Sequence, residues 1–544
     1  MCGLFSVCLA LLQCSGLLWA APAADRCSAE MNRARIVKLT ALLVLCAFAV
    51  FLVALLIRAH TFQPGSWQLR DCLPNNRTLA ANFTPEERDE LLSVFKGAIQ
   101  LPTVSTSYSE LNITALKSFT DYLPKAFPGV FSSDLVRHEI IANYSHLFTV
   151  RGSDPGLRPY ILTAHLDVVP VAEEKWDFPP FSGEESDGYL YGRGTLDDKA
   201  SAVGILQALE FLLNRGYVPR RAFYVAIGHD EEVGGDNGAR NIAATLESRG
   251  VKLSFLLDEG SVILDHIIPG LKKPVAVIAV TEKGQALFSL KVNTQTGHSS
   301  MPMRESSIGI LASAVSRLEK KPMPRMFGLG PELAMFEQLG PEMSFPLNII
   351  MANLWLFAPI ISRTLEKNPS MNALVRTTTA VTEFHAGIKP NVLPPTANAT
   401  LNFRIHPAHS VQGLIEEMRY TIDDDRVKID LLYGFDPLPT SPHDELAFGY
   451  QIIRTTVQNV FPEVFVIPGL SVANTDTRHY QHLTEGLYRF VPLWITQEDT
   501  GRIHGPNERI SVKNYEEIVR FYFHLIQNSD LNLRLNVHSS GHEL

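Results

Sequence analysis

Tyr160-Ile-Leu-Thr-Ala-His-Leu-Asp167 is the stretch that decides the fold, because a mostly apolar run leads directly into an imidazole and a carboxylate. A short continuous apolar run is typical of a strand buried on both faces of a sheet. Residues 222–227 and 253–257 have the same character, and residues 200–214 and 238–249 show helical spacing. Strands and helices alternate, which predicts an α/β catalytic domain with a mostly parallel sheet and helices on both faces, an α/β/α arrangement.

Histidine and acidic side chains follow the predicted strands. Ligands of open α/β sheets bind at the edge formed by the carboxyl ends of the strands, so residues at these ends should converge on one crevice. Four candidates come at or just after such an end: His165, Glu231, Glu232 and Asp258.

Two more candidates complete a donor set for metal ions. Asp197 lies in Gly-Arg-Gly-Thr-Leu-Asp-Asp-Lys and His504 lies in Arg-Ile-His-Gly. Two imidazoles and three carboxylates suffice for two zinc ions that share one bridging carboxylate. Asp198 could be the bridge instead, since spacing does not separate it from Asp197, and nitrogen and oxygen donors also accept cobalt or manganese.

Adjacent glutamates suggest a division of roles. The side chains of Glu231 and Glu232 diverge, so one can bind metal while the other acts as general base toward water. Taken alone, the pair would be interpreted as a solvated acidic turn. Asp167 lies two residues after His165 and could orient its imidazole by accepting a hydrogen bond.

A second pattern interrupts the first after Asp258. Residues 275–280 and 286–293 are predicted antiparallel strands, 307–319 a helix, 399–405 a strand, 411–422 a helix and 427–433 a closing strand. This order favours an inserted ferredoxin-like α+β lid with β-α-β-β-α-β topology. Residues 345–361 inside it are unusually apolar and could form a groove for a long alkyl chain, or equally the core or dimer interface of the lid.

The expected organisation has six parts. The chain is longer than one core usually supports, so at least two domains are expected. The predicted bounds are 1–60 for signal or anchor segments, 61–84 for a stalk, 85–272 and 441–530 for the two parts of the catalytic domain, 273–440 for the inserted lid and dimerisation domain, and 531–544 for a tail.

The N-terminus carries two apolar stretches. Residues 4–20 resemble a signal peptide, and residues 39–57 are uncharged and follow Arg33, Arg35 and Lys38, which suits a membrane anchor with a cytoplasmic basic flank. Either Met1 or Met31 could be the start residue. In both cases the body is expected to be secreted or lumenal, in agreement with sequons at Asn76, Asn82, Asn112, Asn143 and Asn398.

Charge and cysteine content exclude other classes. The formal net charge of -9 argues against a nucleic-acid partner. All six cysteines lie before residue 73, so neither a disulfide scaffold nor a thiolate zinc site is expected in the body.

With these motifs, the chain resembles the dizinc aminoacylase and carboxypeptidase family of co-catalytic metallopeptidases from about residue 85 to 530. The resemblance implies one zinc on His165, Asp197 and Asp258, and the other on Asp197, Glu232 and His504. It further implies that Glu231 is the general base, that Asp167 is the carboxylate behind the ligands, and that the peptide between Asp197 and Asp198 is cis.

The resemblance also extends to the insert. Gly297-His298-Ser299-Ser300 is similar to the lid motif whose histidine stabilises the tetrahedral oxyanion, often across a homodimer. Asn391, Arg404 and Arg478 match positions that hold the polar end of the substrate, and an arginine fork suits a terminal carboxylate.

A narrower resemblance concerns the substrate. Ser307-Ile-Gly-Ile-Leu-Ala, Arg376-Thr-Thr-Thr-Ala, Phe435-Asp-Pro-Leu-Pro and Arg502-Ile-His-Gly-Pro-Asn-Glu are similar to the members of this family that reversibly join a long-chain fatty acid to an amino acid. The implied substrates are small molecules: N-fatty-acyl amino acids, fatty acids and amino acids. A secreted dipeptidase or carboxypeptidase of the same fold, or a noncatalytic carrier, are the alternatives.

Overall fold

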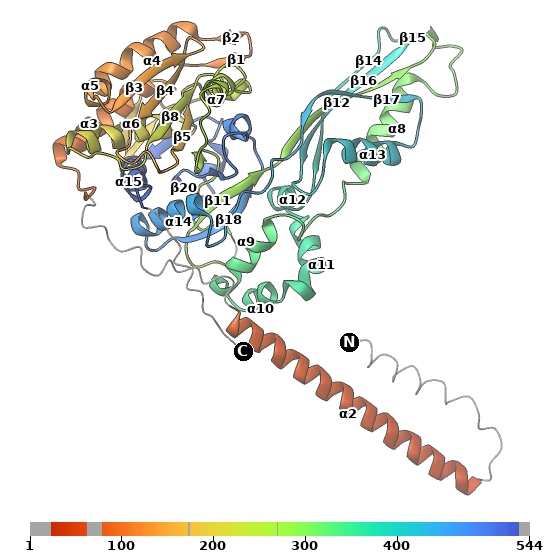
Figure 1. Cartoon of the computed structure of the whole chain (residues 1–544). Coiled ribbons are helices and arrows are strands. Elements are labelled where there is room, and N and C mark those ends of the chain that lie inside the picture. Colours follow the sequence, from red (N-terminus) through yellow and green to blue (C-terminus); the bar gives the residue numbers. More distant parts are fainter. Residues whose placement is uncertain (1–22, 63–78, 172–174, 269, 532–544) are drawn as a thin grey trace. The chain divides into compact units, whose positions relative to one another are not determined.

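The computed structural model describes residues 23–62, 79–171, 175–268 and 270–531 (Figure 1). The chain divides into two compact units, residues 1–62 and 63–544. The predicted signal-like stretch at 4–20, most of the predicted stalk, the sequon at Asn76 and residues 532–544 of the predicted tail lie outside the described residues.

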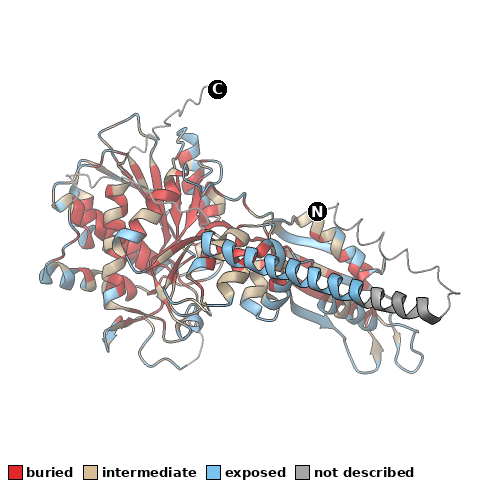
Figure 2. Ribbon diagram, turned by 90° about the horizontal axis from the view of Figure 1, so that it is seen from below, coloured by how far each residue is buried: buried red, intermediate tan, exposed pale blue. Residues whose placement is uncertain are grey.

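The described part of the first unit is the long helix α2 (Ala23–Thr61). Its segment Arg35–Thr61 is long and apolar enough to cross a membrane, with a mean hydropathy of 3.0 and almost no buried side chains (Figure 2). The apolar stretch predicted at residues 39–57 lies inside this segment.

The second unit is built on a large mixed sheet with the strand order β20-β10-β11-β19-β9-β5-β8-β4-β3, in which β18 also pairs with β11. The central strands β19, β9, β5 and β8 are parallel neighbours, and antiparallel pairs flank them on both sides. The predicted α/β class is confirmed, and the parallel part is the centre of the sheet. The bounds are β3 (Val136–Ile141), β4 (Ser145–Val150), β5 (Tyr160–His165), β8 (Phe223–Gly228), β9 (Leu256–Asp258), β10 (Ile263–Leu264), β11 (Val275–Glu282), β18 (Phe465–Ser471), β19 (Leu487–Arg489) and β20 (Trp494–Ile495).

Helices cover both faces of this sheet. One face shares a core with α3, α4, α5, α6, α14 and α15, and the other packs against α7. α6 lies between the sheet and the helices α3 and α15, so all but its last two residues are buried. The bounds are α3 (Pro85–Ile99), α4 (Ile113–Ala126), α5 (Pro128–Ser132), α6 (Lys199–Asn214), α7 (Ala239–Ser248), α14 (Phe448–Val460) and α15 (Val512–Asn528).

The insert contains a separate antiparallel sheet with the strand order β14-β16-β12-β17. Helices α8 and α13 cover one of its faces and share a core with it. The chain order β12-α8-β14-β16-α13-β17 has the predicted β-α-β-β-α-β topology. The bounds are β12 (Gly284–Asn293), α8 (Ser307–Lys320), β14 (Thr378–Ala386), β16 (Thr396–Ile405), α13 (Val411–Ile422) and β17 (Val427–Phe435).

One predicted strand of the insert belongs elsewhere. β11, expected at residues 275–280 as the first strand of the lid, lies in the large sheet beside β18 and β19 and not in the sheet of the insert. Nearly every residue of β11 is buried, as in a strand covered on both faces, whereas β12 alternates between buried and less buried residues. The strand missing from the prediction is β14.

The apolar run at residues 345–361 has a packing role. It forms α10 (Leu347–Ala352) and most of α11 (Leu354–Leu365), which together with α9 (Glu332–Leu339) form a core against Val275 and Ile467 of the large sheet. Part of the run remains on the surface, where Trp355 is 58% exposed and Ile360 is 60% exposed. This part of the insert therefore packs on the catalytic sheet and not within the core of the lid sheet.

Short elements complete the described chain. They are β1 (Ser105–Ser107), β2 (Glu110–Leu111), β6 (Glu184–Ser186), β7 (Tyr189–Tyr191), β13 (Gly297–His298), α12 (Pro369–Val375), β15 (Val392–Leu393) and β21 (Arg509–Ser511), and the 3-10 helices η2 (Glu231–Val233), η3 (Gly340–Glu342), η4 (Asp476–Tyr480) and η5 (Asp499–Gly501).

Two leucines of α11 provide a test of its packing. Leu354 is 2% exposed and Leu356 is 36% exposed. We expect Leu354→Ala to lower the free energy of unfolding by about 2–5 kcal/mol, because it leaves a cavity in a packed core. Leu356→Ala should change it by only about 0.5 kcal/mol. Urea denaturation of both variants measures this, and equal effects would contradict the packing.

Candidate metal centre

Three strand ends bring the predicted residues to one edge of the large sheet. His165 is the last residue of β5, Glu231 and Glu232 follow β8 in η2, and Asp258 is the last residue of β9. Because β9, β5 and β8 are parallel neighbours, their carboxyl ends meet at the same edge. The predicted convergence is therefore observed.

The carboxylate of Asp197 lies between two imidazoles. Its Oδ1 is 2.9 Å from Nε2 of His165, and its Oδ2 is 2.9 Å from Nε2 of His504. Oε2 of Glu232 is 3.4 Å from Nε2 of His504. Asp198 has no hydrogen bond from either imidazole within the described chain, so Asp197 and not Asp198 lies between the two imidazoles. The peptide between Asp197 and Asp198 is cis, as expected.

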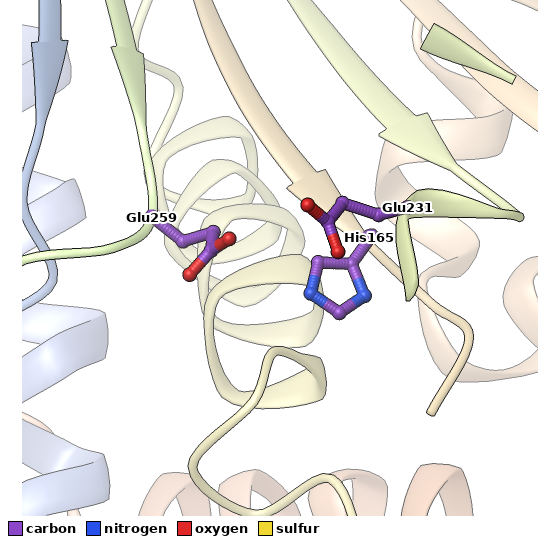
Figure 3. Close-up of side chains that lie close together, drawn as sticks. All are labelled: His165, Glu231 and Glu259. Carbon is purple, nitrogen blue, oxygen red and sulfur yellow. The ribbon is translucent and has the colours of Figure 1, made fainter. Parts of the chain in front are cut away.

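The residue after β9, Glu259, lies close to His165 and to Glu231. Ligand atoms of His165, Glu231 and Glu259 lie within 4.8 Å of one another, and Figure 3 shows the three side chains converging from separate segments. Asp258 belongs to neither of the two candidate ligand groups in the described residues, and its Oδ2 accepts a hydrogen bond of 2.8 Å from Oγ1 of Thr477. The charge of Asp258 also acts on Asp198, next to the Asp197 carboxylate, so both Asp258 and Glu259 lie near the centre.

Asp167 acts mainly on the loop that carries the glutamates. Its carboxylate accepts hydrogen bonds from the backbone N–H of Glu231 at 3.1 Å and of Glu232 at 3.2 Å. Nδ1 of His165 lies 3.0 Å from the backbone oxygen of Asp167 and 3.5 Å from its carboxylate. Asp167 therefore orients His165 chiefly through its main chain, and its carboxylate orders η2.

The centre holds an excess of buried negative charge. Burial raises the pKa of Glu231 and Glu259 well above the ordinary value, and burial with the nearby charge of Asp197 raises the pKa of Glu232 to about 8. Burial also opposes ionisation of Asp197, but hydrogen bonds from the two imidazoles hold its pKa below the usual range. Oε1 of Glu232 has no hydrogen-bond partner in the described chain. Two divalent cations fit this set, since they supply the missing positive charge and take nitrogen and oxygen donors.

The two predicted arginines lie near the junction of the two sheets. Nη1 of Arg404, on β16, donates to Oδ1 of Asn474 and, at 3.3 Å, to Oε1 of Gln285. Arg478, in η4, donates to the backbone oxygen of Gly234, which directly follows the glutamate-bearing η2. Burial and then the charge of Arg478 lower the pKa of Arg404, which places the two guanidinium groups in one electrostatic neighbourhood.

Two other predicted residues lie elsewhere. His298 and Asn391 are neighbours at the end of the insert marked by β15 in Figure 1, where β13 pairs with β15 and the N–H of Ser299 donates to the oxygen of Asn391 at 3.1 Å. His298 is exposed, and its Nδ1 lies 2.7 Å from Oγ of Ser300. Within the single chain, the structure does not bring these two residues to the metal ligands.

The chain is similar in sequence to a known family and to named proteins of other organisms. Residues 161–528 match the family described as Peptidase family M20/M25/M40. The N-fatty-acyl-amino acid synthase/hydrolase of Xenopus tropicalis is 54% identical over 502 residues, covering 92% of this chain and 97% of the relative. The Homo sapiens protein of the same name is 55% identical over 453 residues, covering 83% of this chain and 90% of the relative.

Solved structures share the fold. Human carnosine dipeptidase 1 has a TM-score of 0.58 at 14% identity, covering 82% of this chain and 97% of that chain. The M20 family metallo-carboxypeptidase Sso-CP2 from Sulfolobus solfataricus has a TM-score of 0.59 at 17% identity, covering 81% and 99%. The family match at residues 161–528 spans most of the chain. The synthase/hydrolases of Xenopus tropicalis and Homo sapiens are 54% and 55% identical to the chain over most of both lengths. The chain therefore belongs to Peptidase family M20/M25/M40.

Proposed function

We propose that the protein hydrolyses N-fatty-acyl amino acids, and forms them from free fatty acid and amino acid, at a centre of two zinc ions. The observation that carries this proposal is the position of Asp197, whose two oxygens face one imidazole each, an arrangement suited to a carboxylate shared by two ions that each have one histidine ligand. Relatives at 54–56% identity that are named N-fatty-acyl-amino acid synthase/hydrolase support the choice of substrate.

The proposed ligands form two sets around Asp197. His165 and Asp197 hold one ion together with a carboxylate of the pair Asp258 and Glu259, and Asp197, Glu232 and His504 hold the other. When bound, the ions supply positive charge that acidifies a water molecule and polarises the amide carbonyl.

Glu231 is the proposed proton carrier. It takes a proton from the attacking water and returns it to the nitrogen of the departing amino acid, and in synthesis it carries the proton in the opposite direction. Burial raises its pKa above the ordinary carboxyl value, which strengthens the carboxylate as a proton acceptor. Asp167 holds the backbone of Glu231 for this task.

Arg404 and Arg478 are proposed to hold the carboxylate of the amino acid. Arg478 lies beside the glutamate-bearing loop, Arg404 lies within the electrostatic reach of Arg478, and a guanidinium fork pairs with a carboxylate through two hydrogen bonds. His298 and Asn391 are proposed to serve the centre of a second copy in a homodimer joined through the lid, because in their own chain they lie at the end of the insert. There His298 would donate a hydrogen bond to the developing oxyanion.

The organisation of the chain is proposed to follow this chemistry. The lid sheet is bounded by residues 284–435, and the catalytic domain is formed by the chain on either side of it together with the helices α9, α10 and α11. The apolar segment Arg35–Thr61 is proposed to direct the protein into the secretory route, either as a cleaved signal or as an anchor.

Substrate selectivity tests the function. Purified protein loaded with zinc should hydrolyse long-chain acyl-amino acids in preference to acetyl-amino acids and dipeptides, because each buried methylene contributes about 0.8 kcal/mol. Mass spectrometry of the products measures this preference. Faster turnover of dipeptides would instead support a dipeptidase or carboxypeptidase. Ligand binding without turnover, unaffected by a chelator, would support a carrier.

Removing the proposed base gives a second prediction. Glu231→Gln should lower kcat roughly 100- to 10,000-fold, because the variant cannot accept a proton from water. The control Glu185→Gln, on the exposed strand β6, should keep full activity. Measured rates within a factor of two of each other would rule out Glu231 as the base.

Asp258 and Glu259 can be separated by their effects on metal binding. Glu259→Gln should release one of two zinc ions, because it removes a donor oxygen. Asp258→Asn can still accept the hydrogen bond from Thr477 and should weaken binding only about 10- to 100-fold. Zinc titration of the metal-free proteins compares them, and the opposite order of losses would restore Asp258 as the ligand.

A further inference from the structure

The carboxylate of Glu508 is fully buried next to the bridging ligand. Its Oε1 accepts hydrogen bonds from the backbone N–H of Gly194 at 3.1 Å, of Leu196 at 2.7 Å and of Asp197 at 3.3 Å. Its Oε2 accepts from Nη1 of Arg193 at 2.6 Å. Among the described residues, all the hydrogen bonds of this side chain therefore come from the segment that ends in Asp197.

Arg193 connects the same carboxylate to the second imidazole. Its Nη2 donates to the backbone oxygen of His504 at 3.0 Å, and its guanidinium lies 5.4 Å from the ring centre of Trp176. His504 has a φ of +60°, a left-handed conformation that non-glycine residues seldom adopt. The bond from Arg193 to its carbonyl fixes that conformation, and with it the direction of the imidazole.

We propose that Glu508, acting with Arg193, is a positioning residue for the ion shared by Asp197, Glu232 and His504. The Glu508 side chain is 0% exposed and the Arg193 side chain is 2% exposed, so neither touches substrate. Burying two charges is costly, and a buried ion pair is weak support for stability alone. The hydrogen bonds of the pair suggest a role other than stability. They join the segment that carries Asp197, before the insert, to the segment that carries His504, after the insert.

This inference rests on the proposed two-ion centre, and the experiment separates the two. Metal-free full-length protein is titrated with zinc in competition with a chromophoric chelator. Failure of the unmodified protein to bind two ions would overturn the proposed function. If the unmodified protein binds two ions, the variants of Glu508 and Arg193 then test the positioning role by itself.

Glu508→Gln is the informative variant. Its amide oxygen can still accept from the backbone N–H groups, but its amide nitrogen opposes the guanidinium of Arg193. We expect binding of one ion to weaken about 10- to 100-fold while the other ion keeps its affinity within a factor of about three. Arg193→Lys keeps the positive charge but loses the two guanidinium nitrogens that bond to Glu508 and His504, so it should weaken binding of the same ion. Because the two side chains act as a unit, the double variant should be no worse than the poorer single variant.

Glu210 provides a matched control. Its carboxylate is 5% exposed and accepts hydrogen bonds from the backbone N–H of Gly129 at 2.7 Å and of Val130 at 2.6 Å, and among the described residues it has no hydrogen bond to a candidate ligand. Glu210→Gln should lower the melting temperature and leave both zinc affinities unchanged. If Glu210→Gln lost the same ion, the weaker zinc binding would be a general result of removing a buried carboxylate and not a specific role of Glu508.

Two outcomes would overturn the positioning role. One is retention of both ions by Glu508→Gln with unchanged affinities. If Glu508→Gln does not fold, Arg193→Lys decides, and unchanged affinities in that folded variant are the other contradicting outcome.

Discussion

The arrangement depends on one buried carboxylate that contacts two imidazoles. Asp197 meets His165 from the end of β5 and His504 from a segment 307 residues further along the chain. The contact therefore joins the part of the catalytic domain before the insert to the part after it. Around Asp197, Glu231, Glu232 and Glu259 gather in a setting where burial opposes their ionisation, so the centre needs added positive charge.

The large sheet explains why these groups meet. Parallel strands end at a common edge, and their side chains below that edge are apolar and packed on both faces. The polar groups at the edge therefore stay fixed by a rigid core. The insert leaves from the end of β11 and returns before α14, which separates His504 from the other ligands in sequence but not in space. The pair Glu508 and Arg193 lies at the place where the two parts of the catalytic domain rejoin.

Much of the site could be predicted from sequence because buried strands have a simple signature. A continuous apolar run such as residues 160–164 marks both the strand and the edge at which His165 appears, and the run at residues 222–227 marks the edge at which Glu231 and Glu232 appear. Side-chain direction could not be predicted in the same way. Asp258 and Glu259 are adjacent carboxylates at a strand end, and the sequence does not indicate that Glu259 lies near His165 while Asp258 accepts a hydrogen bond from Thr477.

Long-range packing limited the other predictions. β11 has the composition of a buried strand, but its partner β18 is distant in sequence, so its sheet was assigned wrongly. The apolar run at residues 345–361 packs against the large sheet because α9, α10 and α11 fold back onto it, which no local pattern indicates. Glu508 and Arg193 are ordinary charged residues in sequence, and only their shared burial and hydrogen bonds distinguish them.

An anomalous difference map of the crystallised protein, recorded at the zinc absorption edge, tests the central claim most directly. The account predicts two peaks, one on each side of the Asp197 carboxylate, with nitrogen ligands from His165 and His504 at about 2.0–2.1 Å. A single peak, or two peaks that do not share Asp197, would contradict it.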